Sequence, residues 1–128
     1  MHPQLALVKQ FHEKFKVPVL AKPSLIPPDR SDNRHRLMKD EVEEYLAEVK
    51  QGSIETISKE LADILYTVYG AILEHGLQDR MEALFEEVHQ SNMSKDYHQY
   101  KMIKGPSFFK ADIKKFFPEQ NKPPLSKV

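Results

Sequence analysis

The strongest constraint on the fold is a pair of helix-like segments within residues 37–63, joined at Gly52-Ser53. Each segment carries two acids three residues apart, and these are Glu41 and Glu44 on the first, Glu60 and Asp63 on the second. Because three residues turn about 300° on a helix with 3.6 residues per turn, both members of each pair point the same way. A short connection makes successive helices antiparallel, so the two segments are able to aim four carboxylates into one space.

The helical wheel indicates where these acids lie relative to the core. In both segments they border a stripe of apolar residues at helical spacing, which would face the core. The stripes comprise Met38, Val42, Tyr45 and Val49 on the first helix, and Ile57, Leu61, Ile64, Leu65, Val68 and Ile72 on the second. The second helix is apolar on more than one side, which is typical of a central helix or of one buried in a subunit interface. Acids beside a core face lie where a cleft between packed helices would open.

Four carboxylates held close together need cations, because unpaired anions repel and partly buried ones take up protons. Mg²⁺ suits them best, since it prefers oxygen ligands and normally shares them with water and a phosphate. The alternative for each pair is a solvated acidic face, because Glu is a good helix former and 30% of the residues are charged. The position of the acids on the wheel favours a metal site.

Composition narrows the class of protein. A chain of 128 residues has about the length of one domain. The 19 basic and 19 acidic side chains leave no net charge to attract nucleic acid or a membrane, and the absence of cysteine excludes disulfides and thiolate chemistry. No signal peptide and no apolar run of transmembrane length is recognisable, so we expect a cytoplasmic protein with no membrane or nucleic-acid partner.

The periodicity and capping residues predict an all-α, antiparallel bundle of about four to five helices. The expected helices run over 3–16, from Ser31–Asn33 to Gly52, from Ser53 to Glu74 with Gly76 as its stop, from Gln78 to Ser94, and briefly within 108–117. In the first helix we expect Phe11 and Phe15 in the core and His12 exposed or capping. The four prolines within residues 17–28 predict a loop before the second helix. The predicted domain is 1–117, followed by a loose tail, 118–128, and the 108–117 phenylalanines should be buried against the domain or a partner subunit.

Other residues could complete a phosphate site or suggest a different metal centre. Asn92 and Lys95 share a helix face, Lys101 and Lys104 follow, and lysines supply the point charges that phosphates need, although each alone is typical of solvated surface. Glu86-x-x-His89 is a single ExxH unit, whereas a ferritin-like di-iron bundle needs two, so we interpret both residues as surface. No phosphate-loop, dinucleotide or zincin motif is present.

Three motifs in order suggest a family. They are Asp40-Glu41-x-x-Glu44, Glu60-Leu61-x-Asp63 and Ser91-Asn92-Met93-Ser94-Lys95. Over about residues 5–117 the chain resembles the MazG-like all-α nucleoside triphosphate pyrophosphohydrolase superfamily, and it looks closest to the phosphoribosyl-ATP pyrophosphohydrolase-like branch. The resemblance implies a homodimer or homotetramer with a house-cleaning role. It also implies hydrolysis of a nucleotide between the α and β phosphates, to a monophosphate and pyrophosphate, with dUTP, another dNTP, a damaged NTP or phosphoribosyl-ATP as substrate.

The resemblance also implies roles for single residues. Glu41, Glu44, Glu60 and Asp63 would bind Mg²⁺ or Mn²⁺, while Asn92, Lys95 and Lys104 would contact the nucleotide. Either Glu41 or Asp40 would accept a proton from the attacking water. The family often has Glu where this chain has the shorter Asp40. The alternative function is a non-catalytic helical module that senses nucleotides or binds proteins.

Overall fold

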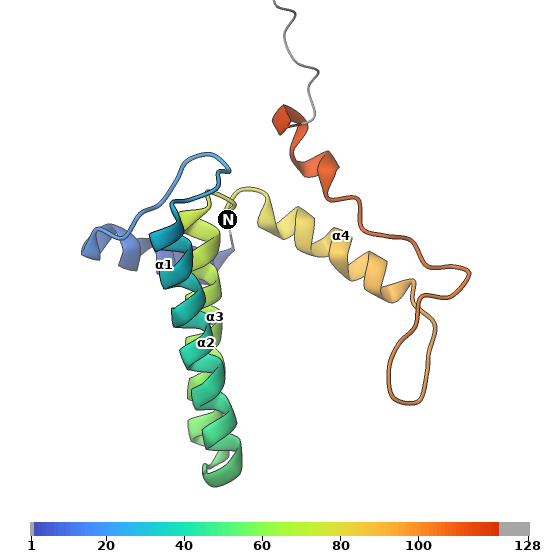
Figure 1. The fold of residues 1–128 in the computed structure, drawn as a ribbon, viewed down its shortest axis with the longest axis horizontal. Helices are drawn as coiled ribbons and strands as arrows, with labels where there is room; N and C mark the ends of the chain where they lie inside the picture. The colour runs from blue at the N-terminus through green and yellow to red at the C-terminus, as the bar shows by residue number, and fades with distance from the viewer. Residues whose placement is uncertain (1, 121–128) are drawn as a thin grey trace, which may run out of the picture. The chain divides into compact units, whose positions relative to one another are not determined.

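A computed structural model describes residues 2–120, which form helices and loops without a β-strand. The elements are α1 (Pro3–Phe15), α2 (Pro28–Gln51), α3 (Ile54–Glu74), α4 (Met81–Met93) and the short 3-10 turns η1 (Lys114–Phe116) and η2 (Pro118–Gln120), labelled by helix in Figure 1. The all-α class is thus confirmed. The chain divides into two compact units, one ending at Asp79 and one beginning at Arg80. Of the predicted tail, residues 121–128 lie outside the described residues.

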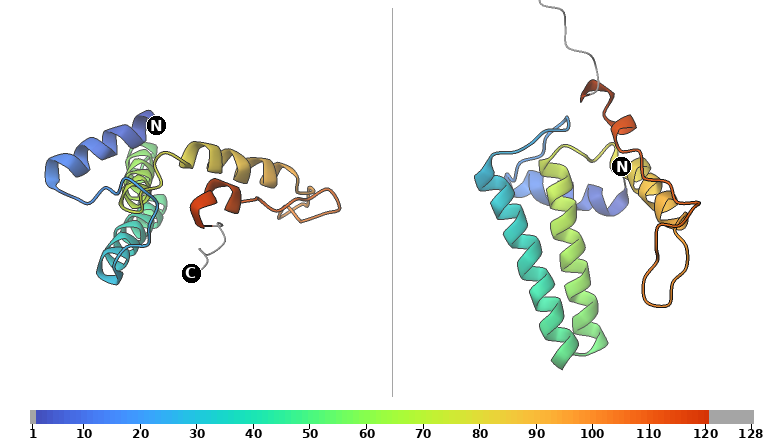
Figure 2. Two further views of the ribbon diagram at one scale, coloured as in Figure 1. Left: turned by 90° about the horizontal axis from the view of Figure 1, so that it is seen from above. Right: turned by 45° about the vertical axis from the view of Figure 1, so that its right-hand side comes forward.

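Helices α2 and α3 form a long antiparallel hairpin, and they lie side by side in every view (Figures 1 and 2). The hairpin turns at Ser53, whose hydroxyl accepts from the Thr56 backbone N–H at 3.4 Å while the Thr56 hydroxyl accepts from the Ser53 N–H at 3.1 Å. This capping box starts α3 where the sequence predicts. Gly76, with a φ of 69°, follows its end as predicted.

Two predicted helix starts are wrong. Helix α2 begins at Pro28 rather than near Ser31–Asn33, because the fixed φ of proline suits a first turn and its missing N–H is not needed there. Helix α4 begins at Met81 rather than Gln78. The Gln78 side chain is instead buried, and its Nε2 donates to the Leu20 carbonyl at 2.7 Å in the proline-rich loop before α2.

Helix α1 packs on α3, and the loop after it is tied to the end of α3. The Leu20 N–H donates to the Leu73 carbonyl at 3.1 Å, and the Ser24 N–H donates to the His75 carbonyl at 3.0 Å. Among the described residues the buried apolar side chains are few, and they are Leu5, Val8, Ile72 and Leu73. The single chain therefore buries its apolar surface mainly where α1 and the last turns of α3 lie.

The expected core of α1 is wrong in two respects. Phe11 and Phe15 are 43% and 56% exposed, although their rings contact each other and Phe11 also contacts Tyr66. His12 is only 2% exposed, and its Nδ1 lies 3.1 Å from the Pro18 carbonyl, to which it donates as the neutral ring. Helix α1 is thus rotated so that the histidine, not the phenylalanines, faces inward.

The apolar stripes of α2 and α3 are also less buried than predicted. Val42, Val49, Leu61 and Leu65 are each 46–48% exposed. The prediction that these stripes form the core of the chain is therefore wrong for these four residues within one subunit. Charged side chains of α2 and α3, namely Arg34, Glu60 and Glu74, are buried more deeply than these four apolar ones.

The second unit consists of α4 and the segment that follows it. The chain turns back through an antiparallel bridge between Asp96 and Ile103, and the Ser91 hydroxyl donates to the Phe109 carbonyl at 2.8 Å. The predicted helix near residues 108–117 is reduced to the 3-10 turn η1. Of the four phenylalanines in 108–117, Phe109 is 46% exposed and the other three are partly buried, so their predicted burial against the domain or a partner subunit stays a prediction. None of the helices in residues 2–120 is long and apolar enough to cross a membrane.

Candidate metal centre

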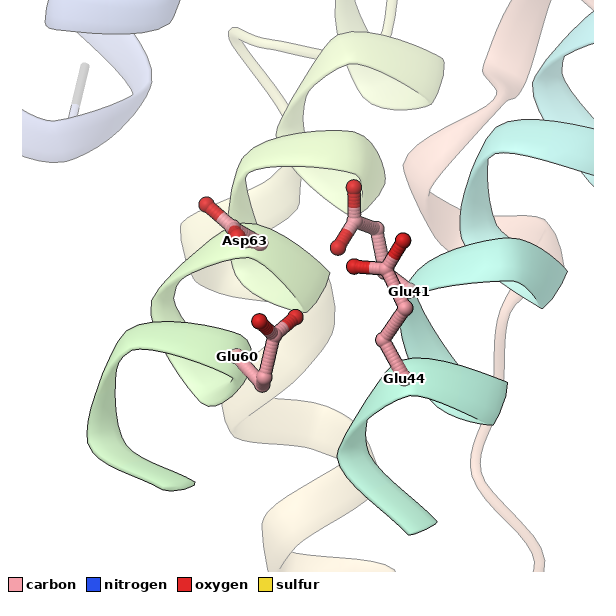
Figure 3. Close-up of side chains that lie close together, drawn as sticks. All are labelled: Glu41, Glu44, Glu60 and Asp63. Atoms are coloured by element: carbon pink, nitrogen blue, oxygen red, sulfur yellow. The ribbon is translucent and has the colours of Figure 1, made fainter. Parts of the chain in front are cut away.

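The α2–α3 hairpin brings together the four acids of the two motifs. Figure 3 shows Glu41 and Glu44 on α2 facing Glu60 and Asp63 on α3. One carboxylate oxygen from each of the four lies within 4.8 Å of the others. The three-residue spacing puts each pair on one helix face, and the tight turn at Ser53 brings those faces together. The hairpin thus forms a compact group of oxygen ligands.

The acids differ in burial, and two of them have unpaired oxygens. Glu60 is buried and Glu41 is partly buried, whereas Glu44 is exposed. The Oε2 atoms of Glu41 and Glu60 are both shielded from solvent and have no hydrogen-bond partner. A buried acceptor without a donor is costly, and each such group in a folded protein calls for an explanation. A divalent cation is a partner that would satisfy both oxygens at once.

The electrostatics of the cluster favour protonation when no cation is present. Burial raises the pKa of Glu41 from 4.5 to about 7, helped by hydrogen bonding to Glu44 and by the neighbouring carboxylates. Burial also raises the pKa of Glu60, with hydrogen bonding to Glu44 as a further cause. Protons and metal cations therefore compete for the same oxygens.

One cationic side chain already contacts the cluster. Lys59 Nζ lies 2.7 Å from Asp63 Oδ2, and this bond raises the pKa of the lysine. The sequence reasoning missed Lys59, although its i,i+4 spacing from Asp63 is a recognisable signal for an ion pair on a helix. Since the ammonium group is largely exposed, it is free to move away when a stronger cation binds.

The remaining predicted site residues lie outside this cluster. Asp40 is on α2 next to Glu41 but is exposed. In the second unit, Asn92 near the end of α4 and Lys104 are exposed, while Lys95 is partly buried. The ammonium group of Lys104 lies 5.3 Å from the centre of the Phe108 ring. The roles predicted for these four residues stay predictions.

The family of the chain follows from a match to a known family model. The sequence matches the family model described as phosphoribosyl-ATP pyrophosphohydrolase over residues 8–92, more than half of the chain. The chain belongs to the phosphoribosyl-ATP pyrophosphohydrolase family. It is therefore a member of the MazG-like superfamily, as the three motifs indicated. No match to a curated protein was found.

Membership of the phosphoribosyl-ATP pyrophosphohydrolase family places the chain among nucleotide pyrophosphohydrolases. The match includes all four clustered acids and ends at Asn92. Lys95 and Lys104 lie beyond it, so their predicted nucleotide contacts depend on the resemblance of the motifs alone. MazG-like pyrophosphohydrolases typically use divalent metals, which agrees with the chemistry of the acid cluster.

Proposed function

We propose that this protein hydrolyses a nucleoside triphosphate, or phosphoribosyl-ATP, between the α and β phosphates in a Mg²⁺-dependent reaction that yields a monophosphate and pyrophosphate. The observation that carries the proposal is the convergence of four carboxylates from α2 and α3 in a chain of a pyrophosphohydrolase family. A scaffold without catalytic function would gain nothing from unpaired, solvent-shielded carboxylate oxygens. This disfavours the alternative of a non-catalytic module.

The donor set fits Mg²⁺ or Mn²⁺. All four side chains offer carboxylate oxygens, the ligand type that hard cations prefer, and no nitrogen or sulfur ligand stands among them. We propose Glu41, Glu44, Glu60 and Asp63 as the residues that hold the metal. When bound, the metal would neutralise these acids together with the charge of the substrate phosphates.

Proton transfer is assigned to the acids of α2. Glu41, a partly buried carboxylate of the cluster, is the first candidate to accept the proton of an attacking water. Asp40, adjacent and exposed, is the second candidate for this role. Its shorter side chain reaches less far than the Glu that is frequent at this position in the family.

The nucleotide would also need donors and positive charge. We propose that Asn92 supplies an amide donor, and that Lys95 and Lys104 supply charge to the phosphates. Lysine provides point charges rather than a fixed fork, which suits a flexible triphosphate chain. These assignments predict weaker substrate binding after charge removal, with little change in metal affinity.

We further propose that the working form is a homodimer or homotetramer in the cytoplasm. Half-exposed apolar residues on α2 and α3, including Val42, Leu61 and Leu65, would be covered by a second copy of the chain. Burial of such side chains is favourable at about 25 cal/mol per Å² of apolar surface. In a single copy these apolar side chains stay half exposed, so this stabilisation is not gained.

The deciding experiment measures pyrophosphate release from a panel of nucleotides, including dUTP, other dNTPs, oxidised NTPs and phosphoribosyl-ATP. We expect release from at least one substrate with Mg²⁺ and none with EDTA. Glu60→Gln should abolish turnover while the helical content is retained, because it removes a metal-binding charge without changing the shape of the side chain. Glu43→Gln, which neutralises an exposed acid of α2, is the matched control and should stay active.

Absence of pyrophosphate release from every substrate, together with no stabilisation by divalent ions, would refute the proposal. That result would favour the nucleotide-sensing or protein-interaction module. Full turnover by the Glu60→Gln variant would refute the assignment of the metal ligands.

A further inference from the structure

A second group of charges lies in the α2–α3 hairpin, apart from the acid cluster. Glu74, near the end of α3, is 1% exposed and binds two arginines of α2. Arg30 Nε and Nη2 donate to its two oxygens at 2.8 and 3.0 Å, and Arg34 Nη1 lies 3.3 Å from its Oε2. We call Arg30, Arg34 and Glu74 the arginine clamp.

Arg34 is held by more than its charge. It is 6% exposed, and its Nη2 also donates to the Thr67 carbonyl of α3 at 2.9 Å. The guanidinium lies against Gly70, where a methyl group would overlap it. Glycine thus leaves the space through which the arginine reaches the backbone of α3. The fit depends on one alignment of the two helices, because the space exists only beside Gly70.

The clamp lies on the same helix faces as the acids. Arg34 and Glu41 are seven residues apart on α2, a turn of about 700°, so they point in nearly the same direction about 10 Å apart along the axis. On α3, Glu74 follows Asp63 by eleven residues, or about three turns, which also returns to the same face. One seam of α2 and α3 therefore carries the clamp towards one end and the acid cluster towards the other.

Stability alone does not explain why the arginine clamp is buried. Burying ion pairs is often no better for stability than burying apolar residues, and their best-attested benefit is to fix one register. The acid cluster needs such a device, because its four carboxylates repel when no cation is bound. A slip of one residue between the helices would shift them by about 1.5 Å and turn them by about 100°, which would separate ligand oxygens that now lie within 4.8 Å.

We infer that Arg34 and Glu74 are positioning residues, which hold α2 and α3 in the register that lets Glu41, Glu44, Glu60 and Asp63 bind one divalent cation. This inference rests on the proposed metal site. The clamp acts at a distance and contacts neither the metal nor the substrate. Its effect is to keep the four ligands together before the cation arrives.

The test replaces the two buried members of the clamp with apolar residues of similar size, in the double variant Arg34→Met/Glu74→Leu. Arg30, which loses its partner in this variant, is partly exposed and can be solvated. Mg²⁺ binding to the full chain is measured by titration calorimetry, and the melting temperature is measured without metal. Such replacements of a buried pair are often neutral or stabilising. We expect a retained melting temperature but Mg²⁺ affinity lowered by about tenfold or more, because the four ligands would no longer be held together before the cation binds.

Leu5→Ala is the matched control, since it removes a buried side chain of α1 and leaves the seam intact. It should lower the melting temperature without changing Mg²⁺ affinity. If the double variant does not fold, Arg34→Lys keeps the charge, loses the fork of donors, and should still weaken Mg²⁺ binding. Unchanged Mg²⁺ affinity in a folded clamp variant would overturn the inference and leave the proposed function standing. Absence of Mg²⁺ binding by the unmodified protein would overturn both.

Discussion

Magnesium binding should depend on pH because Glu41 must lose a proton to bind a cation. The pKa of Glu41 is raised by burial from 4.5 to about 7. The folded protein therefore holds more protons than the unfolded chain between these two values. By linkage, the metal-free protein should lose stability as pH rises from 4.5 through 7, and the full loss should remain above pH 7. A bound cation would replace the proton.

The magnitude follows from that pKa. With a pKa of about 7, Glu41 is about 0.9 protonated at pH 6 and about 0.1 protonated at pH 8. Metal binding should therefore release about 0.9 proton at pH 6 and about 0.1 at pH 8 from this group. The apparent association constant for Mg²⁺ should rise about tenfold over the same interval.

Titration calorimetry measures both the association constant for Mg²⁺ and the proton release. When it is run in two buffers with different ionisation enthalpies, the difference in apparent heat gives the number of protons released. Glu41→Gln is the informative variant. It removes the carboxyl group of Glu41, so the part of the proton release at pH 6 that comes from Glu41 should disappear together with one ligand. Equal Mg²⁺ affinity at pH 6 and pH 8, or proton release that does not vary with pH, would refute this account of the cluster.

Three further changes test separate features of the first unit. Lys59→Gln removes the cation that competes for the cluster, so Mg²⁺ affinity should rise, by up to about fivefold; weaker binding in a titration would contradict this. Gly70→Ala places a methyl group against the guanidinium of Arg34, so it should lower the free energy of unfolding, measured by urea titration, by about 1–3 kcal/mol. An unchanged free energy of unfolding would show that Arg34 does not need the space beside Gly70. If a second copy of the chain covers the half-exposed face around Leu65, Leu65→Lys should shift the molar mass measured by light scattering towards that of the monomer. The control Ser58→Lys, at an exposed position of the same helix, should leave the molar mass unchanged. An unchanged molar mass in the Leu65 variant would argue against that interface.

Short-range spacing made much of the candidate metal centre predictable. The acids occur in pairs three residues apart, and helix geometry alone puts each pair on one face. Ser53 and Gly76 marked where α3 begins and ends, because capping is a property of neighbouring residues. The order of the motifs also indicated the family, which the match over residues 8–92 confirmed.

The choice of which faces meet was not predictable in the same way. Periodicity identified apolar stripes on α2 and α3 as core, yet Val42 and Leu65 remain about half exposed in the single chain. Periodicity reports that a face is apolar, but it does not report whether that face meets the same chain or another one. For the same reason the exposed Phe11 and the buried His12 were assigned the wrong way round.

The sequence by itself determined that α1 to α4 are helical, where α3 begins and ends, and how the acids group on α2 and α3, because these depend on residues within a few positions of one another. Only the tertiary structure decided that the two acid faces meet and that Glu74 pairs with Arg30 and Arg34, forty or more residues away in the chain. An ion pair between distant residues leaves no local pattern, since either partner alone reads as ordinary helix surface. Which residues of α2 and α3 face each other depends on long-range packing, and no short stretch of sequence specifies that packing.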